Sequence, residues 1–330
     1  MAMTAHRSAE PQLLRSHARD VDALRSRLEQ VLLTGRRIEQ DQAGFGALCA
    51  WVLTKLSDRY ERNRDGIAYV EENLTIVVGG LRRAAGGEQP IARWLGVATD
   101  VAAPAGEAPV AYDRDESLSR VMDDTLEWVT EREWVEPQLA DAAPIAEFAL
   151  PVDAAFAALR TAGLATALNC VPLVQQMLDD LSGAPDVVAD QAACWQTIGA
   201  DLQGVAADLQ HSLDHHFGAS PRPDVRAYLD LMSNNVEALM GLGAIAAAMA
   251  VITKAAGDLI LLARDIIRGF IGDLFARVIV WLSDTSAPVS LPVLAVRLSA
   301  VVTACWRIHT YITALVTSVA SLSAVLDDRR

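Results

Sequence analysis

The sequence predicts an all-α protein made of two long antiparallel helical hairpins, packed as an elongated bundle with short connecting helices. Three observations indicate this fold. Apolar residues recur at alternating spacings of three and four over long stretches, as they do along one face of a paired helix. Turns that pair glycine with an aromatic residue interrupt these stretches, and no segment shows the alternation typical of a β-strand. With 330 residues, 52% of them hydrophobic and 21% charged, the chain can bury a large core.

The first hairpin is predicted in residues 1–84. Pro11 is expected in the first turn of its opening helix, where a missing N–H costs nothing. Each of its two apolar seams contains one polar residue, His17 in the first and Asn63 in the second. A polar residue in a seam commonly fixes the alignment of two helices, so we expect both to be satisfied core positions. The apolar positions are Leu14, Val21, Leu24, Leu28 and Val31, then Leu53, Leu56, Tyr60, Ile67, Val70, Leu74, Val77 and Leu81.

The stretch QDQAGFGALCA, residues 40–50, separates the two seams. Its two glycines, Gly44 and Gly46, supply backbone angles that other residues resist, and the connection is short enough to force the helices antiparallel. Phe45 lies between them and is expected to close the end of the hairpin. We therefore place the first hairpin turn at Gly44, Phe45 and Gly46.

The middle of the chain does not sustain this periodicity. Gly, Pro and Ala concentrate in residues 85–116, which we interpret as a flexible linker. Residues 117–184 are interpreted as an acidic connector of short helices. These helices are expected at 117–134, which Pro137 would stop, and at 152–166 and 172–182.

The long-helix pattern returns in residues 185–330, which we predict to form a second helical bundle. Its turn is marked by Phe217 and Gly218, followed by two prolines. Further helical segments are expected at 241–283 and 293–326. The seam positions are Trp195, Ile198, Leu202, Val205 and Leu209, then Val225, Leu229, Met232, Val236 and Leu239.

The net charge of −14 comes mainly from the middle of the chain. Residues 91–223 hold 21 of the 42 acidic side chains but only 6 of the 28 basic ones. Such an acidic region would repel phosphate, and nucleic-acid binding needs a basic face. We therefore expect no nucleic-acid partner.

The only cluster of metal-ligand residue types comprises His211, Asp214, His215 and His216. It lacks the HExxH pattern and has no general-base glutamate between His211 and His215. It also lacks a second cluster that could complete the coordination. We interpret it as a polar hairpin end and expect no metal site, cofactor, small-molecule substrate or catalytic residue. The four cysteines show no CxxC spacing and are interpreted as small apolar residues of the core.

Two uncharged segments, 238–253 and 308–326, approach the length that crosses a membrane. The first falls short of the roughly 20 residues that a bilayer core needs. The second carries many Ser and Thr residues in amphipathic positions. Buried bundle helices are one interpretation, and conditional membrane insertion is the alternative.

Paired heptad helices joined at an aromatic-glycine turn resemble the WXG-type helical hairpins exported by actinobacterial type VII secretion systems. Residues 12–83 look closest to the secretion-associated (EspC-like) branch, whose turn reads D-x-x-F-G, here Asp41 to Gly46 with a one-residue offset. Residues 186–326 resemble the second hairpin of large substrates, several of which are trafficking halves of polymorphic or channel-forming toxins. Here the second turn has His216, Phe217 and Gly218 where the family has Trp-x-Gly, and the one literal WxG, at 94–96, lies in the linker.

The resemblance implies a non-enzymatic secretion substrate, or a toxin-trafficking module, acting through protein–protein contacts. The family's export signal, a tyrosine followed four residues later by an acid, is matched by Tyr112 and Glu116 in YDRDE. The implied partners are a small WXG-type helical protein or a secretion ATPase. The opening residues MAMTAHRSAEPQ lack the apolar region of a signal peptide, so we expect a cytoplasmic protein that is exported, or displayed at the cell surface, by a signal-independent route. The alternative function is a membrane-active, pore-forming protein.

Overall fold

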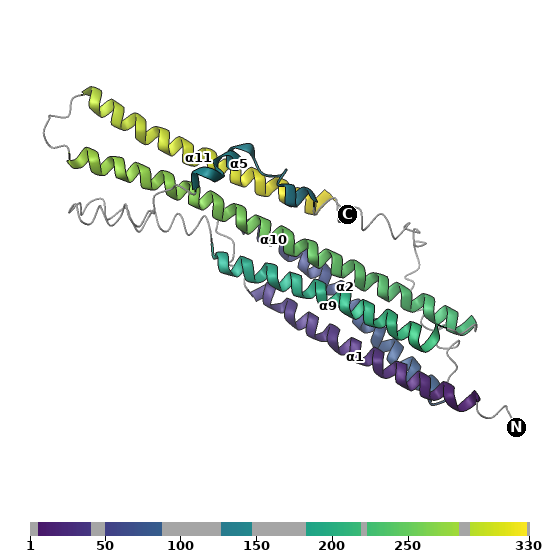
Figure 1. Cartoon of the computed structure of the whole chain (residues 1–330). Helices are drawn as coiled ribbons and strands as arrows, with labels where there is room; N and C mark the ends of the chain where they lie inside the picture. The colour runs from purple at the N-terminus through teal and green to yellow at the C-terminus, as the bar shows by residue number, and fades with distance from the viewer. Residues whose placement is uncertain are drawn as a thin grey trace. The chain divides into compact units, whose positions relative to one another are not determined.

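The computed structural model describes residues 6–40, 50–87, 127–146, 183–218, 223–283 and 291–328. Of these residues 95% are helical and none lies in a strand, which confirms the all-α prediction. Figure 1 shows the helices, which are α1 (His6–Gln40), α2 (Ala50–Ala85), α5 (Pro137–Ala146), α9 (Pro185–Phe217), α10 (Pro223–Ser283) and α11 (Leu291–Asp328). The linker residues from 88 onward and the helices expected at 152–166 and 172–182 lie outside the described residues.

Glycine ends α2 by a backbone effect. Gly87 adopts a φ of 77°, which is accessible to glycine at little cost. In this conformation its N–H donates to the carbonyl of Ala84 at 3.1 Å, and the N–H of Gly86 donates to the carbonyl of Arg82 at 3.1 Å. Two carbonyls at the helix end thereby gain hydrogen-bond partners.

Two prolines differ from their predicted roles. Helix α1 already begins at His6, so Pro11 lies inside it and not in its first turn. Pro11 removes one backbone hydrogen bond from α1. Packing of the buried face of this 35-residue helix contributes more stability than that bond would. Pro137 begins α5, because its fixed φ suits a first helical position, as Pro185 does in α9.

The helix expected to end near residue 240 continues instead. Helix α10 runs unbroken for 61 residues, so the segment predicted from 241 onward is part of it. Gly243 lies inside this helix and faces α9, where a Cβ built on it would lie 3.2 Å from the carbonyl oxygen of Gly199. Gly243 is therefore required for the close packing of α9 and α10.

The chain divides into two compact units, each assembled from separate stretches of sequence. Unit 1 comprises Met1–Gln40, Ser57–Asp124 and Ala193–Ala250, and unit 2 comprises Asp41–Leu56, Thr125–Ala192 and Val251–Arg330. Among the described helices, unit 1 thus holds α1, most of α2, most of α9 and the first part of α10. Unit 2 holds α5, the starts of α2 and α9, the rest of α10, and α11.

In unit 1, α1 and α2 lie antiparallel. Arg25 of α1 binds Glu71 of α2 at 3.1 Å, while Asp22, one turn earlier in α1, binds Arg82, three turns later in α2, at 2.9 Å. Helices α9 and α10 are also antiparallel, since Phe217 contacts Tyr228 near their adjoining ends and Gly199 approaches Gly243 farther along.

The two pairs also contact each other within unit 1. Arg27 of α1 forms an ion pair with Asp208 of α9. The Asn63 side chain of α2 donates to the carbonyl of Leu242 in α10 at 3.1 Å. Asn63 is buried and hydrogen-bonded, as the sequence predicts for a polar seam position.

Three of the four predicted seams are buried wherever their side chains are described. The fourth seam is shifted by one residue at two positions. Tyr228 and Asn235 are buried, whereas Leu229 and Val236, which were predicted for the seam, are only half-buried. Both sets of positions fit a spacing of three and four, and the apolar character of Leu229 and Val236 led to the wrong prediction. Asn235 has hydrogen-bond partners in Leu231 and Asn73.

In unit 2, the later part of α10 and α11 lie antiparallel. The ring of Phe270 stacks on Tyr311 at 5.4 Å between centroids, and the Arg297 guanidinium lies 5.8 Å from the centre of the Trp281 ring. Helix α5 packs beside α11 (Figure 1). The N–H of Glu136, just before α5, donates to the hydroxyl of Ser318 in α11 at 2.8 Å, which joins the two elements.

Candidate functional site

A buried polar network lies where α9 and α10 adjoin in unit 1. His17 of α1 is fully buried. Its Nδ1 lies 3.0 Å from the hydroxyl oxygen of Ser212 in α9, and its Nε2 lies 2.7 Å from the hydroxyl oxygen of Tyr228 in α10. Phe217 closes the network, with its ring edge-on to His17 at 4.9 Å. The seam position predicted for His17 is thus a satisfied core position.

Burial determines the protonation of this network. Removal from water, followed by the nearby His216, lowers the pKa of His17 from 6.5 to about 3, against an opposing effect of Asp20. Burial also raises the pKa of the Tyr228 hydroxyl. Both groups are therefore neutral at physiological pH, and the imidazole joins one hydrogen bond as donor and the other as acceptor.

The Ser212–His17 pair has the spacing of a nucleophile and its general base, but not the electrostatics. A general base works best with a pKa near the operating pH, and activating pairs usually orient the histidine with a carboxylate. His17 has a pKa of about 3, and its second nitrogen contacts a neutral tyrosine hydroxyl. The low pKa of His17 and its hydrogen bonds to α9 and α10 favour a role in holding three helices together.

The histidine cluster predicted to be a polar hairpin end is divided between two environments. His216 turns toward α1 and contacts Asp20, with 2.8 Å between Nε2 and the carboxylate oxygen. His211 and His215 are exposed and lie with nearly parallel rings 6.4 Å apart. No group of three His, Cys, Asp or Glu side chains that could hold a metal ion is found in the parts of the chain that the structure describes.

The predicted turn residues are described only in the second hairpin. Phe217 is buried against His17 and Tyr228. Gly218 follows the last helical residue, and its N–H donates to the carbonyl of Asp214 at 3.0 Å. The first turn, Gly44, Phe45 and Gly46, and both export-signal residues, Tyr112 and Glu116, lie outside the described residues.

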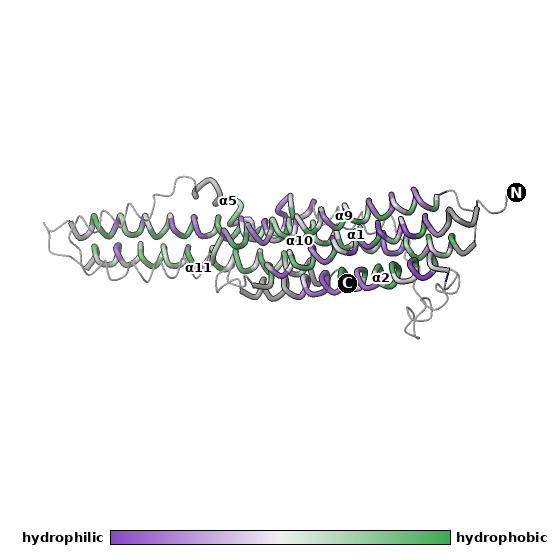
Figure 2. The backbone as a smooth tube through the Cα atoms, turned by 90° about the horizontal axis from the view of Figure 1, so that it is seen from below, coloured by the Kyte–Doolittle hydropathy of each residue, from purple (hydrophilic) through white to green (hydrophobic). Residues whose placement is uncertain are grey.

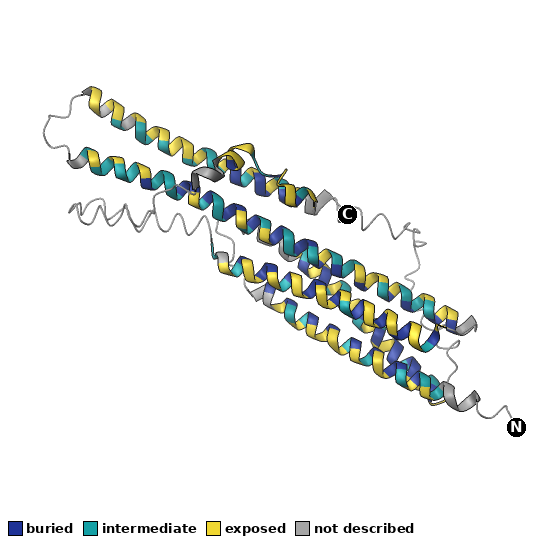
Figure 3. Cartoon of the chain, viewed as in Figure 1, coloured by how far each residue is buried: buried dark blue, intermediate teal, exposed yellow. Residues whose placement is uncertain are grey.

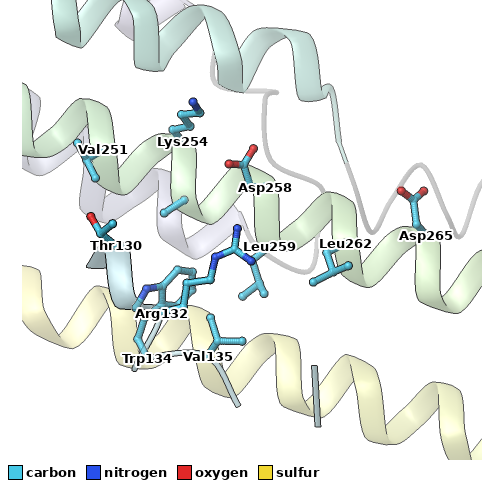
Figure 4. Close-up of a pocket in the computed structure, with 11 residues that line it drawn as sticks. Thr130, Arg132, Trp134, Val135, Val251, Lys254, Asp258, Leu259, Leu262 and Asp265 are labelled. Atoms are coloured by element: carbon cyan, nitrogen blue, oxygen red, sulfur yellow. The ribbon is translucent and has the colours of Figure 1, made fainter. Parts of the chain in front are cut away.

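Unit 2 contains a cavity of about 690 Å³ that the sequence did not predict. Figure 4 shows Arg132, Trp134 and Val135 on one side, from the turn before α5, and residues of α10 on the other. Arg132 adopts a φ of 59°, which few residues other than glycine or asparagine adopt, and this ends the helical turn before it. The cavity is lined by Thr130, Arg132, Trp134, Val135, Val251, Lys254, Ala255, Asp258, Leu259, Leu262 and Asp265.

Acidic, basic and apolar side chains all line this cavity. Lys254 and Asp258 are exposed, whereas Leu259 and Trp134 are buried. The indole N–H of Trp134 already donates to the carbonyl of Val129 at 3.1 Å. Sequence reasoning could not find this site, because its two walls are more than 100 residues apart and neither carries a motif.

The two uncharged segments considered for membrane insertion contribute to the cores of their units. Segment 238–253 supplies Leu239, Ala246, Met249 and Ile252, and segment 308–326 supplies Ala314, Leu315, Val319 and Leu322. By length and composition, the Val225–Trp281 stretch of α10 could still cross a membrane, and 44% of its most apolar window is buried. Of the two described cysteines, Cys194 is half-buried, whereas Cys305 is exposed and so is not the core residue that was predicted.

Comparison of the chain with protein-family models, with curated proteins and with solved structures found no match.

Proposed function

We propose that this protein is a non-enzymatic substrate, or trafficking module, of a type VII-like secretion system, and that it acts through its helical surfaces. The observation that carries the proposal is the repeated helix pair in unit 1, where α1 returns along α2 and α9 returns along α10. Successive antiparallel pairs of this length are what the resemblance to WXG-type hairpins implies. The neutral, fully bonded His17 network supports a packing role for the polar core.

One face of α2 suits a helical partner. Tyr69 and Ile76 are seven residues apart and therefore lie on the same side of the helix. Their exposed fractions are 58% and 42%, although the seam on the other side of α2 is buried. We propose that a small WXG-type protein, or a helix of the secretion ATPase, packs on this second stripe.

The proposed export signal is Tyr112 with Glu116. On a helix these two side chains would share one face, where an export motor could read them together. The protein would be cytoplasmic before export and then secreted or held at the cell surface. No cofactor and no small-molecule substrate take part in the proposed function.

The test follows export from an actinobacterial host with an active type VII system. Tyr112→Ala and Glu116→Ala are each expected to remove the protein from the culture filtrate while its level in cells and its melting temperature stay unchanged. Trp306→Ala is the control for the signal, because Trp306 is an exposed aromatic residue outside α2 and is followed four residues later by Thr310, not by an acid. Export of the Tyr112→Ala and Glu116→Ala variants at the wild-type level would refute the signal assignment.

A second experiment tests the helical partner. Tyr69→Asp/Ile76→Asp should abolish co-purification of a co-expressed WXG-type partner, because two carboxylates replace apolar contacts. Val302→Asp/Trp306→Asp, which makes the same kind of change in α11, should leave it intact. Equal binding by all three proteins would show that α2 is not the docking face.

A further inference from the structure

The cavity of unit 2 has the size of a small-molecule site. Its volume of about 690 Å³ falls within the range of roughly 300–1,000 Å³ that ligand pockets occupy. The described residues that line it all belong to unit 2, so both walls lie in one compact unit. Neither the sequence patterns nor the proposed secretion role accounts for this cavity.

Helix α10 turns one face toward the cavity. Val251, Lys254, Asp258, Leu262 and Asp265 follow one another at spacings of three and four, which keeps them on the same side of the helix. Figure 2 shows hydrophobic and hydrophilic positions interspersed along α10, and Figure 3 shows exposed positions among buried ones. In Figure 4, Lys254 lies near one end of this row and Asp265 at the other, with Asp258 and Leu262 between them. The wall therefore runs from a cation to a carboxylate.

Arg132 stands on the opposite wall, and its backbone is strained. Its φ of 59° is rare for a residue other than glycine or asparagine, and such strain is found preferentially at functional sites. Its N–H donates to the carbonyl of Val129 at 3.4 Å, and its carbonyl accepts from the N–H of Val135 at 2.9 Å. The turn is thus fixed on both sides of Arg132. Figure 4 shows that the side chain extends from this turn toward α10.

Four charged side chains line the cavity, and none of them is neutralised within it. Arg132, Lys254, Asp258 and Asp265 form no side-chain hydrogen bond and no ion pair with any residue that the structure describes. Elsewhere on α10, by contrast, an exposed aspartate and arginine pair at 3.0 Å. Two cations and two carboxylates suit a ligand that carries one charge of each sign.

We propose that this cavity binds a short apolar peptide with free ends. Arg132 and Lys254 would bind its carboxylate, and Asp258 and Asp265 would bind its ammonium group, since hydrogen bonds between charged groups are the stronger ones. The apolar body of the peptide would lie over Leu262. A fatty acid fits less well, because it has no ammonium group for the two aspartates.

The length of the charged wall sets the length of the ligand. Lys254 and Asp265 are eleven residues apart, which is about 16 Å along a helix. An extended tripeptide spans about 10 Å. The charged side chains of the cavity can reach over the remaining distance. Buried Leu259 forms part of the apolar floor between the two ends.

The test is isothermal titration calorimetry of the full chain with trileucine. We expect a Kd below about 1 mM. N-acetyl-trileucine lacks the ammonium group and trileucine amide lacks the carboxylate. Each should bind at least about tenfold more weakly than trileucine, because a charge-assisted contact is lost. Octanoate, a fatty acid, should also bind at least about tenfold more weakly.

Substitutions in the protein then assign the two ends of the peptide. Asp265→Asn should weaken the binding of trileucine about tenfold but leave the binding of N-acetyl-trileucine unchanged, because that peptide has no ammonium group to lose. Lys254→Gln should weaken trileucine in the same way and leave the amide unchanged. Arg132→Asn should also weaken trileucine, and asparagine tolerates the backbone conformation at this position.

Two matched controls lie on the same helix outside the cavity. Asp273→Asn and Arg277→Gln each remove one charge from α10, and both variants should bind trileucine like the wild type. All five substituted side chains are exposed, so the melting temperatures should stay close to that of the wild type.

Three results would overturn the proposal. The first is the absence of trileucine binding to the wild type. The second is binding of the blocked peptides or of octanoate as tightly as trileucine, which would mean that the charges do not contribute. The third is an equal loss of binding in the two control variants. None of these results bears on export of the Tyr112→Ala variant, so this proposal and the proposed function fail independently.

Discussion

The imidazole Nε2 of His17 and the hydroxyl oxygen of Tyr228 lie 2.7 Å apart in the interior of unit 1, although 211 residues separate them in the chain. This hydrogen bond joins α1 to α10, and the bond from His17 to Ser212 adds α9. A buried imidazole with partners on two other helices fixes their alignment, because any axial shift would leave it without a hydrogen bond.

Stability should fall in mild acid because of His17. Its folded-state pKa of about 3 lies below the ordinary 6.5, so the unfolded chain binds this proton first as the pH falls. The contribution is complete above pH 6.5 and is lost progressively toward pH 3, by at most about 5 kcal/mol. Urea unfolding at a series of pH values should show this slope, and His17→Gln should flatten it. The other five histidines are present in both proteins, and an unchanged slope in the variant would contradict the assignment.

Removal of the Tyr228 hydroxyl should destabilise unit 1. Tyr228→Phe leaves one nitrogen of the buried imidazole without its partner, at a cost of about 1–3 kcal/mol. Tyr69→Phe removes the same atom from an exposed position and should change the free energy of unfolding by less than about 0.5 kcal/mol. Equal effects in urea unfolding would show that the hydrogen bond contributes nothing.

The close approach of α9 and α10 should tolerate no methyl group at Gly199. A Cβ there would lie 3.0 Å from the carbonyl oxygen of Gly243 and 3.1 Å from the backbone nitrogen of Ala247, neither of which can move alone. We expect Gly199→Ala to lower the melting temperature, with about 1–3 kcal/mol of destabilisation.

Gly79→Ala is the control for this prediction. A methyl group there would meet only the end of the Arg83 side chain, at 3.7 Å. It should stabilise the protein by up to about 1 kcal/mol, because alanine favours a helix more than glycine does. If Gly199→Ala were also stabilising, the two helices could not be packed as closely as described.

Ser318→Ala should loosen the segment before α5 from α11. The buried hydroxyl of Ser318 accepts from the N–H of Glu136 at 2.8 Å, and the substitution leaves that donor without its partner, at about 1–3 kcal/mol. Hydrogen exchange should speed up in residues 127–146. Ser321→Ala is the control, since that hydroxyl bonds only within its own helix, to the carbonyl of Thr317, and no change is expected there.

The local parts of the fold could be predicted closely. Apolar spacing of three and four depends only on neighbouring residues, and it placed Val21, Leu28 and Leu74 in the core correctly. Helix ends were less predictable. Glycine can mean a helix end, as at Gly87, or a close contact, as at Gly243, and the sequence does not distinguish the two.

The candidate sites were predicted less well, because their residues come from distant parts of the sequence. His17 was identified as a polar core position, but Ser212 and Tyr228 were not identified as its partners, because nothing local marks residues that meet across three helices. The cavity bordered by Arg132 and Asp258 could not be predicted either, because only packing brings the turn before α5 to α10. The cluster of four polar residues at 211–216 looked like a unit in the sequence, yet its members face different sides of the helix.

The sequence by itself determined that the chain is helical and which side of α1, α2 and α9 is buried, since both follow from the period of the helix. Only the tertiary structure decided that Tyr228 and Asn235 enter the core in place of Leu229 and Val236. The physical reason is that a polar side chain is stable there only if another helix supplies its hydrogen bonds. His17 and Asn73 supply them, and both lie far away in the chain.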